Sequence, residues 1–313
     1  RRGLGCVRWL DHREPVPPSL QGAIIALGNF DGFHRGHQAV AGEAIKWARE
    51  EGRPSIVATF DPHPVRFFKP DVEPFRLTTL EQRQELYIEA GATAMLVLHF
   101  DHELASTSAE DFIGDLLAKR LGAAGVVTGE DFTFGKARGG NVDVLRDVGA
   151  RHDIRARTVA PVGDDEVISS SRIRAALREG DPQEAARLLT RPFAIRGIVE
   201  HGDKRGRDIG YPTANLSVES YLRPKFGVYA VSGRILATGQ ELKGAANIGI
   251  RPQFEPPKEL LEPYFFDFKG DLYGQEIEVA FHHFLRGEAK FDSLEELIEQ
   301  IERDCTRAAE LLG

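Results

Sequence analysis

The first half of the chain alternates short, largely apolar runs with stretches in which apolar residues recur every three or four positions. Four of the runs have the composition of strands that are covered on both faces of a sheet: 23–27, 55–60, 94–100 and 125–129. The stretch after the first run places five side chains on one face of a helix that ends near Gly52: Val40, Ala41, Ala44, Ile45 and Ala48. Strands that alternate with helices predict a parallel, doubly wound α/β sheet.

Three loops of unusual composition each follow one of these strands. They read GNFDGFHRGH (28–37), DPHPVRFF (61–68) and GEDFTFG (129–135). Ligands of doubly wound sheets bind beyond the carboxyl ends of the strands, so we expect the three loops to meet at one site. Thr79 with Gln82, and Ser108 with Asp111, have the spacing of capping boxes and predict the starts of two further helices.

From about residue 190 the pattern changes to short aromatic or β-branched runs separated by glycine-rich turns, which favours an antiparallel barrel or sandwich. The central Gly-Asp of FKGDLYG (268–274) predicts a hairpin turn. A helix should close the chain, because Ser293 and Glu296 form a capping box ahead of an apolar stripe: Leu294, Leu297, Ile298 and Ile301. We place the domain boundary near residue 187, giving domains 1–187 and 188–313.

Composition and charge narrow the classes of function. The 313 residues are 42% hydrophobic and 28% charged, with a formal net charge of −8, which argues against nucleic acid as the main partner. Two cysteines, Cys6 and Cys305, cannot build a disulfide framework, so a reducing, cytoplasmic location is expected. Charges interrupt the basic first residues, which makes them a poor secretion signal, and no apolar run has the length of a membrane span.

The loop 28–37 has the features of an anion site. Backbone N–H groups at a helix start point outward together with the positive end of the helix dipole. Gly28 and Gly32 relieve a tight loop, and at Gly36 a side chain would crowd an approaching phosphate. His34 and His37 can donate hydrogen bonds to phosphate oxygens. A metal site and two surface histidines without a function are the alternatives.

A second segment, ISSSRIRAAL (168–177), places serines where a helix would begin and arginines in its first turns. Arg172 and Arg174 oppose the local helix dipole, which a solvent-exposed face alone does not explain. A bound triphosphate would explain both, since serine hydroxyls and a guanidinium are good phosphate donors. Exposed arginines on an ordinary helix are the alternative.

Four segments together resemble the adenylyltransferase module of bacterial bifunctional riboflavin kinase/FAD synthetase, a member of the nucleotidylyltransferase superfamily: GNFDGFHRGH, TFDPHP, GEDFTFGKARGG and ISSSRIR. The resemblance implies that ATP is held by Gly28, Asn29, His34, Gly36 and His37, with Ser169, Ser170 and Arg172 closing over it. We count Asp31, in the same loop, among the ligand-binding residues. The resemblance places the flavin against Phe60, Pro62, Asp131 and Phe132. In this family the FMN phosphate attacks the α-phosphorus of ATP, releasing pyrophosphate and forming FAD.

The segment EHGDKRGRDIGYPTANL (200–216) has the composition of a second phosphate-binding loop. Its glycines and cations form a flexible, positive stretch that includes Lys204, Gly206, Arg207 and Gly210. Thr213 and Asn215 follow it and supply oxygen ligands of the kind that Mg²⁺ accepts. The segment is not a Walker A loop, because the G-x-x-x-x-G-K-[ST] pattern is missing. A basic surface hairpin is the alternative.

The same half of the chain resembles the riboflavin kinase module, through GRDIGYPTAN, GVYA, NIGIRP, FDFKGDLYG and FLRGEAKFDSLEELIEQIERD. The resemblance implies a small antiparallel barrel with a terminal helix, in which Thr213 and Asn215 coordinate Mg²⁺-ATP. Glu262 matches the general base that acts on the ribityl 5′-hydroxyl, and Arg286 and Phe291 help to cover the flavin. The chain departs from the family pattern at Pro263, directly after the base, and at Gln253, where a threonine is usual.

We therefore expect an Mg²⁺-dependent enzyme that converts riboflavin to FMN and then FMN to FAD, using ATP in both steps. Its partners would be ATP, riboflavin and FMN, without nucleic acid or membrane, and the sequence leaves its oligomeric state open. Three alternatives are an FMN adenylyltransferase whose barrel only binds flavin, a tRNA-charging enzyme, and a flavin-binding regulator without turnover. Acidic composition and the lack of a basic anticodon-binding domain weigh against the second.

Overall fold

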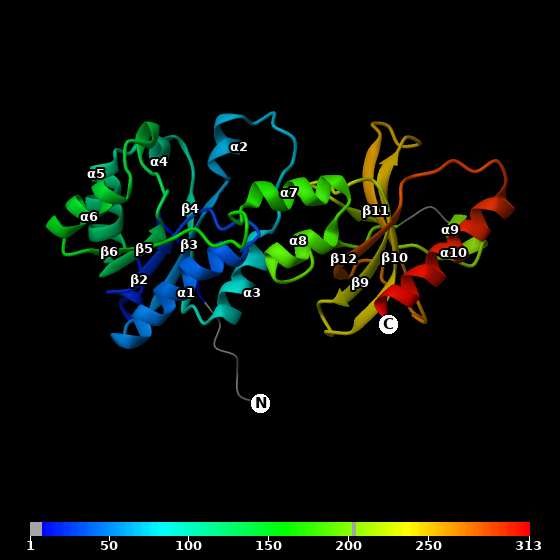
Figure 1. Cartoon of the computed structure of the whole chain (residues 1–313), viewed down its shortest axis with the longest axis horizontal. Coiled ribbons are helices and arrows are strands. Elements are labelled where there is room, and N and C mark those ends of the chain that lie inside the picture. Colours follow the sequence, from blue (N-terminus) through cyan, green and yellow to red (C-terminus); the bar gives the residue numbers. More distant parts are fainter. Residues whose placement is uncertain (1–7, 202–204) are drawn as a thin grey trace. The chain divides into compact units, whose positions relative to one another are not determined.

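The computed structural model describes residues 8–201 and 205–313 of the chain, and it separates into two compact units (Figure 1). The described residues up to Val72, together with Thr79–Ser169, form the first unit. The short segment Glu73–Thr78 and all described residues from Ser170 to Gly313 form the second. Each unit has its own sheet, and each is described by itself below.

The first unit is built on a six-stranded parallel sheet, which confirms the predicted doubly wound α/β domain. The strand order is β1-β4-β3-β2-β5-β6. The strand bounds are β1 Arg8–Asp11, β2 Ile24–Leu27, β3 Ser55–Asp61, β4 Ala94–His99, β5 Gly125–Gly129 and β6 Arg155–Val159. The four strands expected from the apolar runs are the four central ones.

The two outer strands were missed because each has only one neighbour in the sheet. β1 pairs only with β4 and reads RWLD, and β6 pairs only with β5 and reads RARTV. Strands at an edge keep part of their surface in water and accept charged residues. The continuous apolar run that marks a central strand is therefore not required of them.

Helices cover both faces of this sheet. They are α1 Arg35–Glu50, α2 Pro64–Phe68, α3 Leu80–Ala90, α4 His102–Ser106, α5 Ala109–Asp111, a π-helix Phe112–Arg120 and α6 Val142–Arg151, with short 3₁₀ turns at Pro18–Leu20 and Lys136–Arg138. Successive strand residues point to opposite faces. Ile24 and Ala26 pack in the core under α1 and α3, whereas Ile25 and Leu27 pack in the core under the π-helix and α6.

All three predicted helix starts are found, but only the first is a complete capping box. Thr79 forms a complete capping box with Gln82 at the start of α3. The Ser108 hydroxyl accepts a hydrogen bond from the Asp111 N–H, which is the forward half of such a box. Ser293 likewise accepts from the Glu296 N–H, but the Glu296 carboxylate bonds the N–H of Asp292 instead of Ser293.

The second unit is an antiparallel six-stranded barrel with the strand order β7-β12-β9-β10-β11-β8. An antiparallel bridge between Glu200 and Asn215 joins the chain after β7 to the chain before β8, so the sheet nearly closes. Its strands are β7 Ala194–Ile198, β8 Leu216–Ser217, β9 Gly227–Ile235, β10 Glu241–Arg251, β11 Lys258–Phe265 and β12 Glu276–Arg286. Of the two architectures that the sequence pattern favoured, a barrel or a sandwich, the structure has the barrel.

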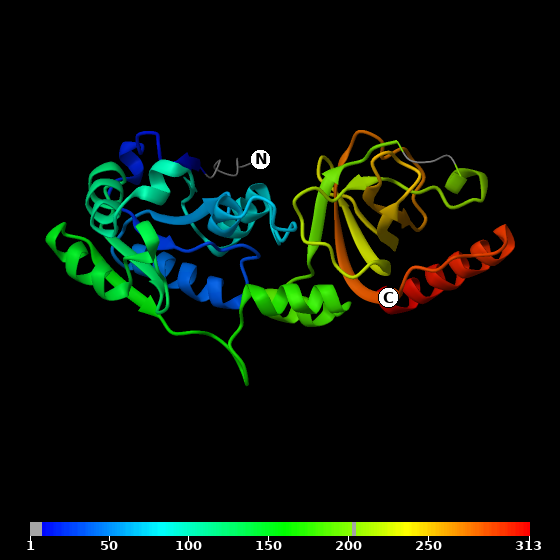
Figure 2. The ribbon, with the colours of Figure 1, turned by 90° about the horizontal axis from the view of Figure 1, so that it is seen from above.

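The helices among the described residues of this unit are α7 Ser170–Glu179, α8 Pro182–Leu189, α9 Arg205–Asp208 and α10 Leu294–Leu312. The terminal helix α10 packs along the outside of the barrel, against β9, β10 and β12 (Figure 2). Its predicted stripe is exposed at Leu294 and half-buried at Leu297, Ile298 and Ile301, and Leu297 and Ile301 border a cavity. None of the helices in the two described ranges has the length and apolar character needed to cross a membrane.

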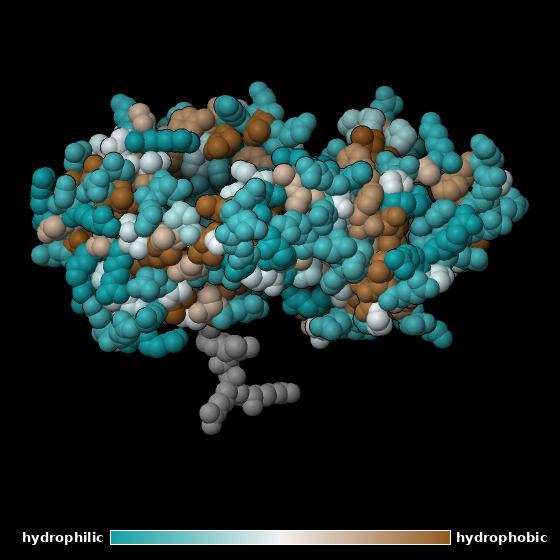
Figure 3. Space-filling model, in the orientation of Figure 1, coloured by the Kyte–Doolittle hydropathy of each residue, from teal (hydrophilic) through white to brown (hydrophobic). Residues whose placement is uncertain are grey.

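The predicted hairpin at 268–274 is wrong. β11 and β12, which flank this segment, are not neighbours: β11 pairs with β10 and β8, and β12 pairs with β7 and β9. The Gly-Asp turn therefore belongs to a connection that crosses between two distant positions of the barrel. The face of the molecule in Figure 3 is mostly hydrophilic, with apolar residues in separate patches, as the charged composition leads one to expect.

Candidate active sites

The loop between β2 and α1 holds its backbone in an unusual conformation. Phe30, Gly32 and Phe33 all have positive φ, at 52°, 87° and 45°. This region is uncommon for non-glycine residues and costs free energy, which packing must offset. Both phenylalanine rings are 2% exposed, and the Phe33 ring lies 4.9 Å from that of Tyr87. The buried rings anchor the loop and present its backbone at the carboxyl end of the sheet.

His34 caps α1 with its own side chain. Its Nδ1 accepts hydrogen bonds from the N–H groups of Gly36, at 3.0 Å, and His37, at 3.3 Å. Because Nδ1 accepts, the ring proton of neutral His34 lies on Nε2. The His37 ring stacks on the His34 ring at 3.6 Å and meets the edge of Phe30 at 5.3 Å. The two imidazoles thus form one fixed pair at the positive end of the helix.

The arrangement around His34 requires a glycine at position 36. A Cβ at this position would lie 2.9 Å from Cε1 of His34 and 3.1 Å from its Nδ1. The His34 ring is a part of the cap and has no room to move aside without losing it. That Gly36 also leaves space for a phosphate stays a prediction. The contact with the His34 ring is a separate, steric reason for glycine at this position.

A buried ion pair supports the loop from below. Arg83 on α3 donates to the Asp31 carboxylate at 3.0 Å, and both side chains are 4% exposed. The same guanidinium donates to the Thr59 hydroxyl, which donates to the backbone carbonyl of Asn29. Asp31 therefore has a clear place in the framework under the loop, and its role toward a ligand stays a prediction.

An aromatic cavity of about 720 Å³ opens at the same end of the sheet. Of the residues expected on the flavin side, Phe60, Asp131 and Phe132 line it, and Pro62 is exposed outside its lining. Asn29 lines it too, and its Oδ1 is buried without a hydrogen-bond partner among the described residues. Further aromatic side chains complete the wall: Phe68, Phe100, Phe112 and Phe134. Flat apolar faces of this kind suit a planar ring system.

The residues of the second predicted segment fall in both units. Ser169 ends the first unit, whereas Ser170 opens α7 in the second. Arg172 lies 3.5 Å from the Glu184 carboxylate on α8, and Arg174 donates to the backbone carbonyl of Phe75 at 2.9 Å. Arg187 and Arg172 both keep the pKa of Glu184 below its ordinary value. Whether Ser169, Ser170 and Arg172 act with the histidines stays a prediction.

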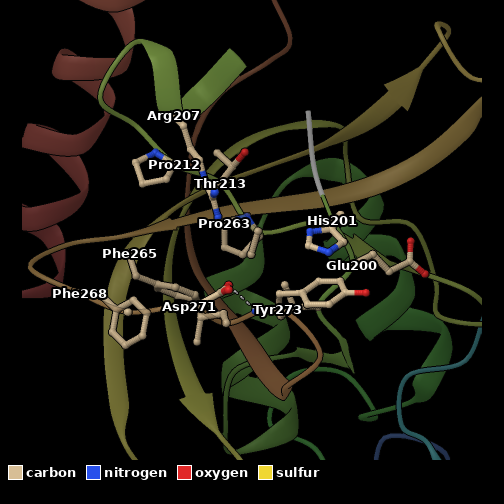
Figure 4. A pocket seen from close by; sticks show the side chains of 14 residues that line it. Glu200, His201, Arg207, Pro212, Thr213, Pro263, Phe265, Phe268, Asp271 and Tyr273 are labelled. Atoms are coloured by element: carbon tan, nitrogen blue, oxygen red, sulfur yellow. Dashed lines mark hydrogen bonds between the residues drawn. The ribbon is translucent and has the colours of Figure 1, made fainter. Parts of the chain in front are cut away.

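The barrel unit carries two cavities, on opposite sides of β11. Pro263 and Phe265 line one of about 420 Å³, shown in Figure 4, and Glu262 and Tyr264 line the other, of about 590 Å³. Successive residues of a strand point to opposite faces, so the strand separates the two. Thr213 lines both cavities.

The cationic segment before Thr213 borders the smaller cavity. Arg207 lies in its lining, across from the His201 and Tyr273 rings, which stack at 3.4 Å (Figure 4). Gly206 belongs to the short helix α9, Gly210 has φ of +86°, and Lys204 lies outside the described residues. Asn215 is 4% exposed, and its Oδ1 has no hydrogen-bond partner in the part of the chain that the structure describes.

In the larger cavity Glu262 is held by an arginine that sequence reasoning did not single out. Arg251 on β10 donates to Glu262 Oε2 through Nε, at 2.9 Å, and through Nη2. Its Nη1 lies 3.5 Å from Glu288. Burial opposes the charge on Arg251, but the hydrogen bonds and negative charges of Glu262 and Glu288 together outweigh it and keep the pKa of Arg251 above its ordinary value. The candidate base thus has a fixed orientation.

Two other side chains define this cavity. Arg286 lines it and is tied to Asp304 of α10, with its Nη2 at 2.9 Å from Oδ2, while its guanidinium lies over the Phe291 ring at 5.6 Å. Asn247 faces Glu262 directly across the strand pair, and its Oδ1 is buried without a hydrogen-bond partner among the described residues. The apolar stripe of α10 contributes Leu297 and Ile301.

Sequence reasoning missed Arg83, Thr59, Asn247 and Arg251. Arg83 meets Asp31 from 52 positions away, and no local pattern marks such a pair. Asn247 and Arg251 lie in NIGIRP, which was recognised as a segment without a role for either side chain. The period-two pattern of β10 and β11 could have placed Asn247 beside Glu262, but only if the register of the two strands had been known.

Comparisons with known proteins match two successive parts of the chain to two family models. The family model for FAD synthetase matches residues 16–172, and the model for riboflavin kinase matches residues 189–312. The bifunctional riboflavin kinase/FMN adenylyltransferase of Escherichia coli K12 is 39% identical over 299 residues, covering 94% of each chain. The protein of that name from Pseudomonas fluorescens is 40% identical over 296 residues, again covering 94% of each. A crystal structure described as a macrolide-efflux protein from Streptococcus pneumoniae superposes with a TM-score of 0.84 at 32% identity, covering 95% of this chain and 97% of that one.

Proposed function

We infer that this chain, which belongs to the family of bifunctional riboflavin kinase/FMN adenylyltransferases, makes FMN from riboflavin and then FAD from FMN in two separate sites. It carries both an FAD synthetase and a riboflavin kinase domain, so it is an ATP-dependent transferase with flavins as substrates and products. The assignment of the two steps to two sites is supported by functional groups of different chemistry in the two units. A histidine pair at a helix start lies in the first unit, and an arginine-held carboxylate lies in the second.

We assign the adenylyltransferase step to residues 1–187 and the kinase step to residues 188–313. The match of the riboflavin kinase model, which begins at residue 189, supports this functional boundary. The helices α7 and α8 precede it and pack in the second compact unit. Our proposal therefore counts them, by function, with the adenylyltransferase domain, because α7 carries Ser170 and Arg172.

In adenylyl transfer the protein positions two phosphates and supplies hydrogen bonds to charge that shifts between them. We propose that the backbone at Gly28, Asn29 and Gly36 receives the ATP phosphates, and that His34 donates from Nε2. His37, stacked on His34, and Arg172 would neutralise the pyrophosphate as it departs. An oxygen of the FMN phosphate forms the new bond to the α-phosphorus, and the bond from that phosphorus to pyrophosphate breaks. Such a reaction needs positioning more than a protein nucleophile.

In the kinase step Glu262 would accept the proton of the ribityl 5′-hydroxyl while that oxygen attacks the γ-phosphorus and ADP leaves. The two cavities on either side of β11 support this assignment. The smaller one, with Arg207 and Gly210 nearby, would take the nucleotide, and the larger one would take the flavin under Arg286 and Phe291. Thr213 lines both cavities, and we propose that it lies beside the phosphoryl group during its transfer.

The residues fit an Mg²⁺ ion that accompanies ATP. Asn215 offers a buried amide oxygen that no described residue satisfies, and Thr213 offers a hydroxyl two positions earlier. Both are hard oxygen donors of the type that Mg²⁺ accepts. When bound, the ion would neutralise phosphate charge. We propose Thr213 and Asn215 as its protein ligands and expect Asn215→Ala to raise the Mg²⁺-ATP concentration needed for half-maximal FMN formation.

A time course tests the proposed function. The full chain, incubated with riboflavin, ATP and Mg²⁺, should produce FMN first and FAD afterwards when the flavins are separated chromatographically. FAD formed from added FMN, with riboflavin left unchanged, would establish the adenylyltransferase-only alternative. Pyrophosphate release that depends on an amino acid instead of FMN would support a tRNA-charging enzyme. We also propose a cytoplasmic location, which the two-cysteine composition supports.

A further inference from the structure

The Asn247 side chain carries a polar atom whose situation calls for a ligand. Its Oδ1 is buried and has no hydrogen-bond partner within residues 8–201 and 205–313. Buried polar atoms in folded proteins are almost always paired, since leaving one unpaired costs about 1–3 kcal/mol. Asn247 also lines the 590 Å³ cavity of the barrel unit. The residue that carries this atom therefore borders a space that a polar group can enter.

The register of the barrel places Asn247 beside the candidate base. Asn247 on β10 pairs with Glu262 on β11 and with Val228 on β9, and all three line the same cavity. Directly opposite residues of an antiparallel pair have Cβ atoms about 4.5–5.5 Å apart on the same face of the sheet. The amide and the carboxylate thus converge on one part of the cavity, while Val228 offers only an apolar surface.

The chemistry of the substrate next to Glu262 is that of a polyhydroxylated chain. If Glu262 takes the proton of the 5′-hydroxyl, the atoms beside Asn247 belong to the neighbouring part of the ribityl group. A hydroxyl both donates and accepts, so it can satisfy the amide oxygen. Aromatic and aliphatic side chains that suit the ring system also line this cavity: Tyr264, Phe291, Leu297 and Ile301.

We propose that Asn247 binds a secondary hydroxyl of the ribityl chain and thereby makes the kinase site specific for flavins with a polyhydroxylated side chain. This inference rests on the proposed kinase function. A site built to hydrogen-bond a substrate hydroxyl rejects the analogue that lacks it, because the buried protein atom is then left unpaired. Asn247 is a binding residue in this account, and Glu262 alone takes the proton.

The test combines a variant with hydroxyl deletions in the substrate. The full chain, Asn247→Leu and the control Gln240→Leu are compared on riboflavin and on its 2′-, 3′- and 4′-deoxy analogues, all of which keep the 5′-hydroxyl. Gln240 carries an amide in the same hairpin but is exposed. Wild type and Gln240→Leu should lose about ten- to hundredfold in kcat/KM on one analogue. Asn247→Leu should show a similar loss on riboflavin and no further loss on that analogue.

Several outcomes would overturn the inference. Equal ratios of kcat/KM in wild type and Asn247→Leu for all three analogues would mean that a water molecule, and not the flavin, satisfies Asn247. Equal activity of wild type on all four flavins would do the same. Failure of wild type to phosphorylate riboflavin at all would instead overturn the proposed kinase function. If circular dichroism shows that Asn247→Leu does not fold, Asn247→Ala, which also lacks a side-chain hydrogen-bonding group, replaces it in the same comparison.

Discussion

The Arg251 side chain extends along β10 and binds the carboxylate of Glu262 on the neighbouring strand β11. It lies four residues beyond Asn247, the direct neighbour of Glu262, yet its Nε and Nη2 both donate to Glu262 Oε2. Its third nitrogen lies 3.5 Å from Glu288, on the segment between β12 and α10. The proposed base, Glu262, is therefore held in one orientation toward the cavity. A proton transfer requires such a defined geometry.

Replacing Arg251 should therefore slow the kinase without disabling it. We expect Arg251→Met to lower kcat for FMN formation by about tenfold or more, since small misplacements of a catalytic group have effects of this size or larger. Arg251→Lys keeps the positive charge but cannot donate from two nitrogens of a planar guanidinium, so it should retain part of the kcat that Arg251→Met loses. Steady-state kinetics with riboflavin and ATP measure both, and FAD formation from added FMN serves as the control. Unchanged kcat in Arg251→Met would show that the contact between Arg251 and Glu262 has no role in turnover.

Gly36→Ala should impair adenylyl transfer through the His34 ring. The new Cβ would lie 2.9 Å from Cε1 of that ring and would push it away from the two N–H groups it caps. We expect FAD formation to fall by about tenfold or more while FMN formation is retained. Gly42→Ala on the same helix is the matched control, because a Cβ there meets nothing within 4 Å. That variant should keep full activity and gain up to about 1 kcal/mol in helix stability.

The buried pair of Asp31 and Arg83 should dominate the stability of the loop region. Removing one partner of a buried ion pair leaves an uncompensated charge and costs about 3–5 kcal/mol. We expect Arg83→Met to lower the free energy of unfolding by this amount. The double variant Asp31→Asn/Arg83→Met should lose less than the sum of the two single changes.

Fluorescence-monitored denaturation is suited to this measurement, because both tryptophans of the chain, Trp9 and Trp47, lie in the first unit. Additive losses in the double variant would mean that the two side chains do not support each other. A loss below about 1 kcal/mol in Arg83→Met would contradict the structural role that we give the pair.

The first unit should lose stability in mild acid through His12. This ring is 6% exposed, and its Nδ1 accepts a hydrogen bond from the His99 N–H at 3.0 Å. Burial lowers the pKa of His12 below its ordinary value, with His99 and Arg120 acting in the same direction and Asp11 and Asp101 opposing them. The folded state therefore favours the neutral ring. The stabilisation is complete well above pH 6.5, the ordinary pKa of a histidine, where the unfolded ring is also neutral, and it declines as the pH falls through that value and the unfolded ring takes up a proton.

Denaturation followed by tryptophan fluorescence at pH 7.5 and pH 5.5 measures this effect. His12→Asn keeps an oxygen that can accept from His99 but does not titrate. We expect the wild-type protein to lose more stability between the two pH values than this variant does. Equal losses in the two proteins would assign the acid sensitivity to other groups.

Sequence patterns predicted the central parts of both units because those parts follow local rules. The runs of β2 to β5 are apolar on both faces since both faces are covered, and the face of α1 from Val40 to Ala48 is apolar because it packs on that sheet. Thr79 and Gln82 satisfy each other within one turn, so their spacing alone identifies them. The edge strands β1 and β6 obey no such rule and were missed.

The site residues divide in the same way. His34 and Gly36 were found because a helix start, a glycine and a donor occur within a few positions of each other. Asp31 with Arg83, and Arg251 with Glu262, are contacts made by tertiary structure, and the register that brings Asn247 to Glu262 is set by the closure of the barrel. The turn at Gly270 and Asp271 shows the opposite error, since a local hairpin signal lies in a connection between strands that do not pair.

The central claim is that the chain contains two independent sites, each for one step. The measurement that tests it most directly compares Glu262→Gln and His37→Ala, each supplied with ATP and Mg²⁺ and either riboflavin or FMN, with flavins separated by chromatography over time. We expect Glu262→Gln to lose FMN formation by about a hundredfold or more and to convert FMN to FAD at the wild-type rate. His37→Ala should accumulate FMN from riboflavin and form FAD about a hundredfold more slowly. Loss of both steps in either folded variant, or of neither step in both, would contradict the account.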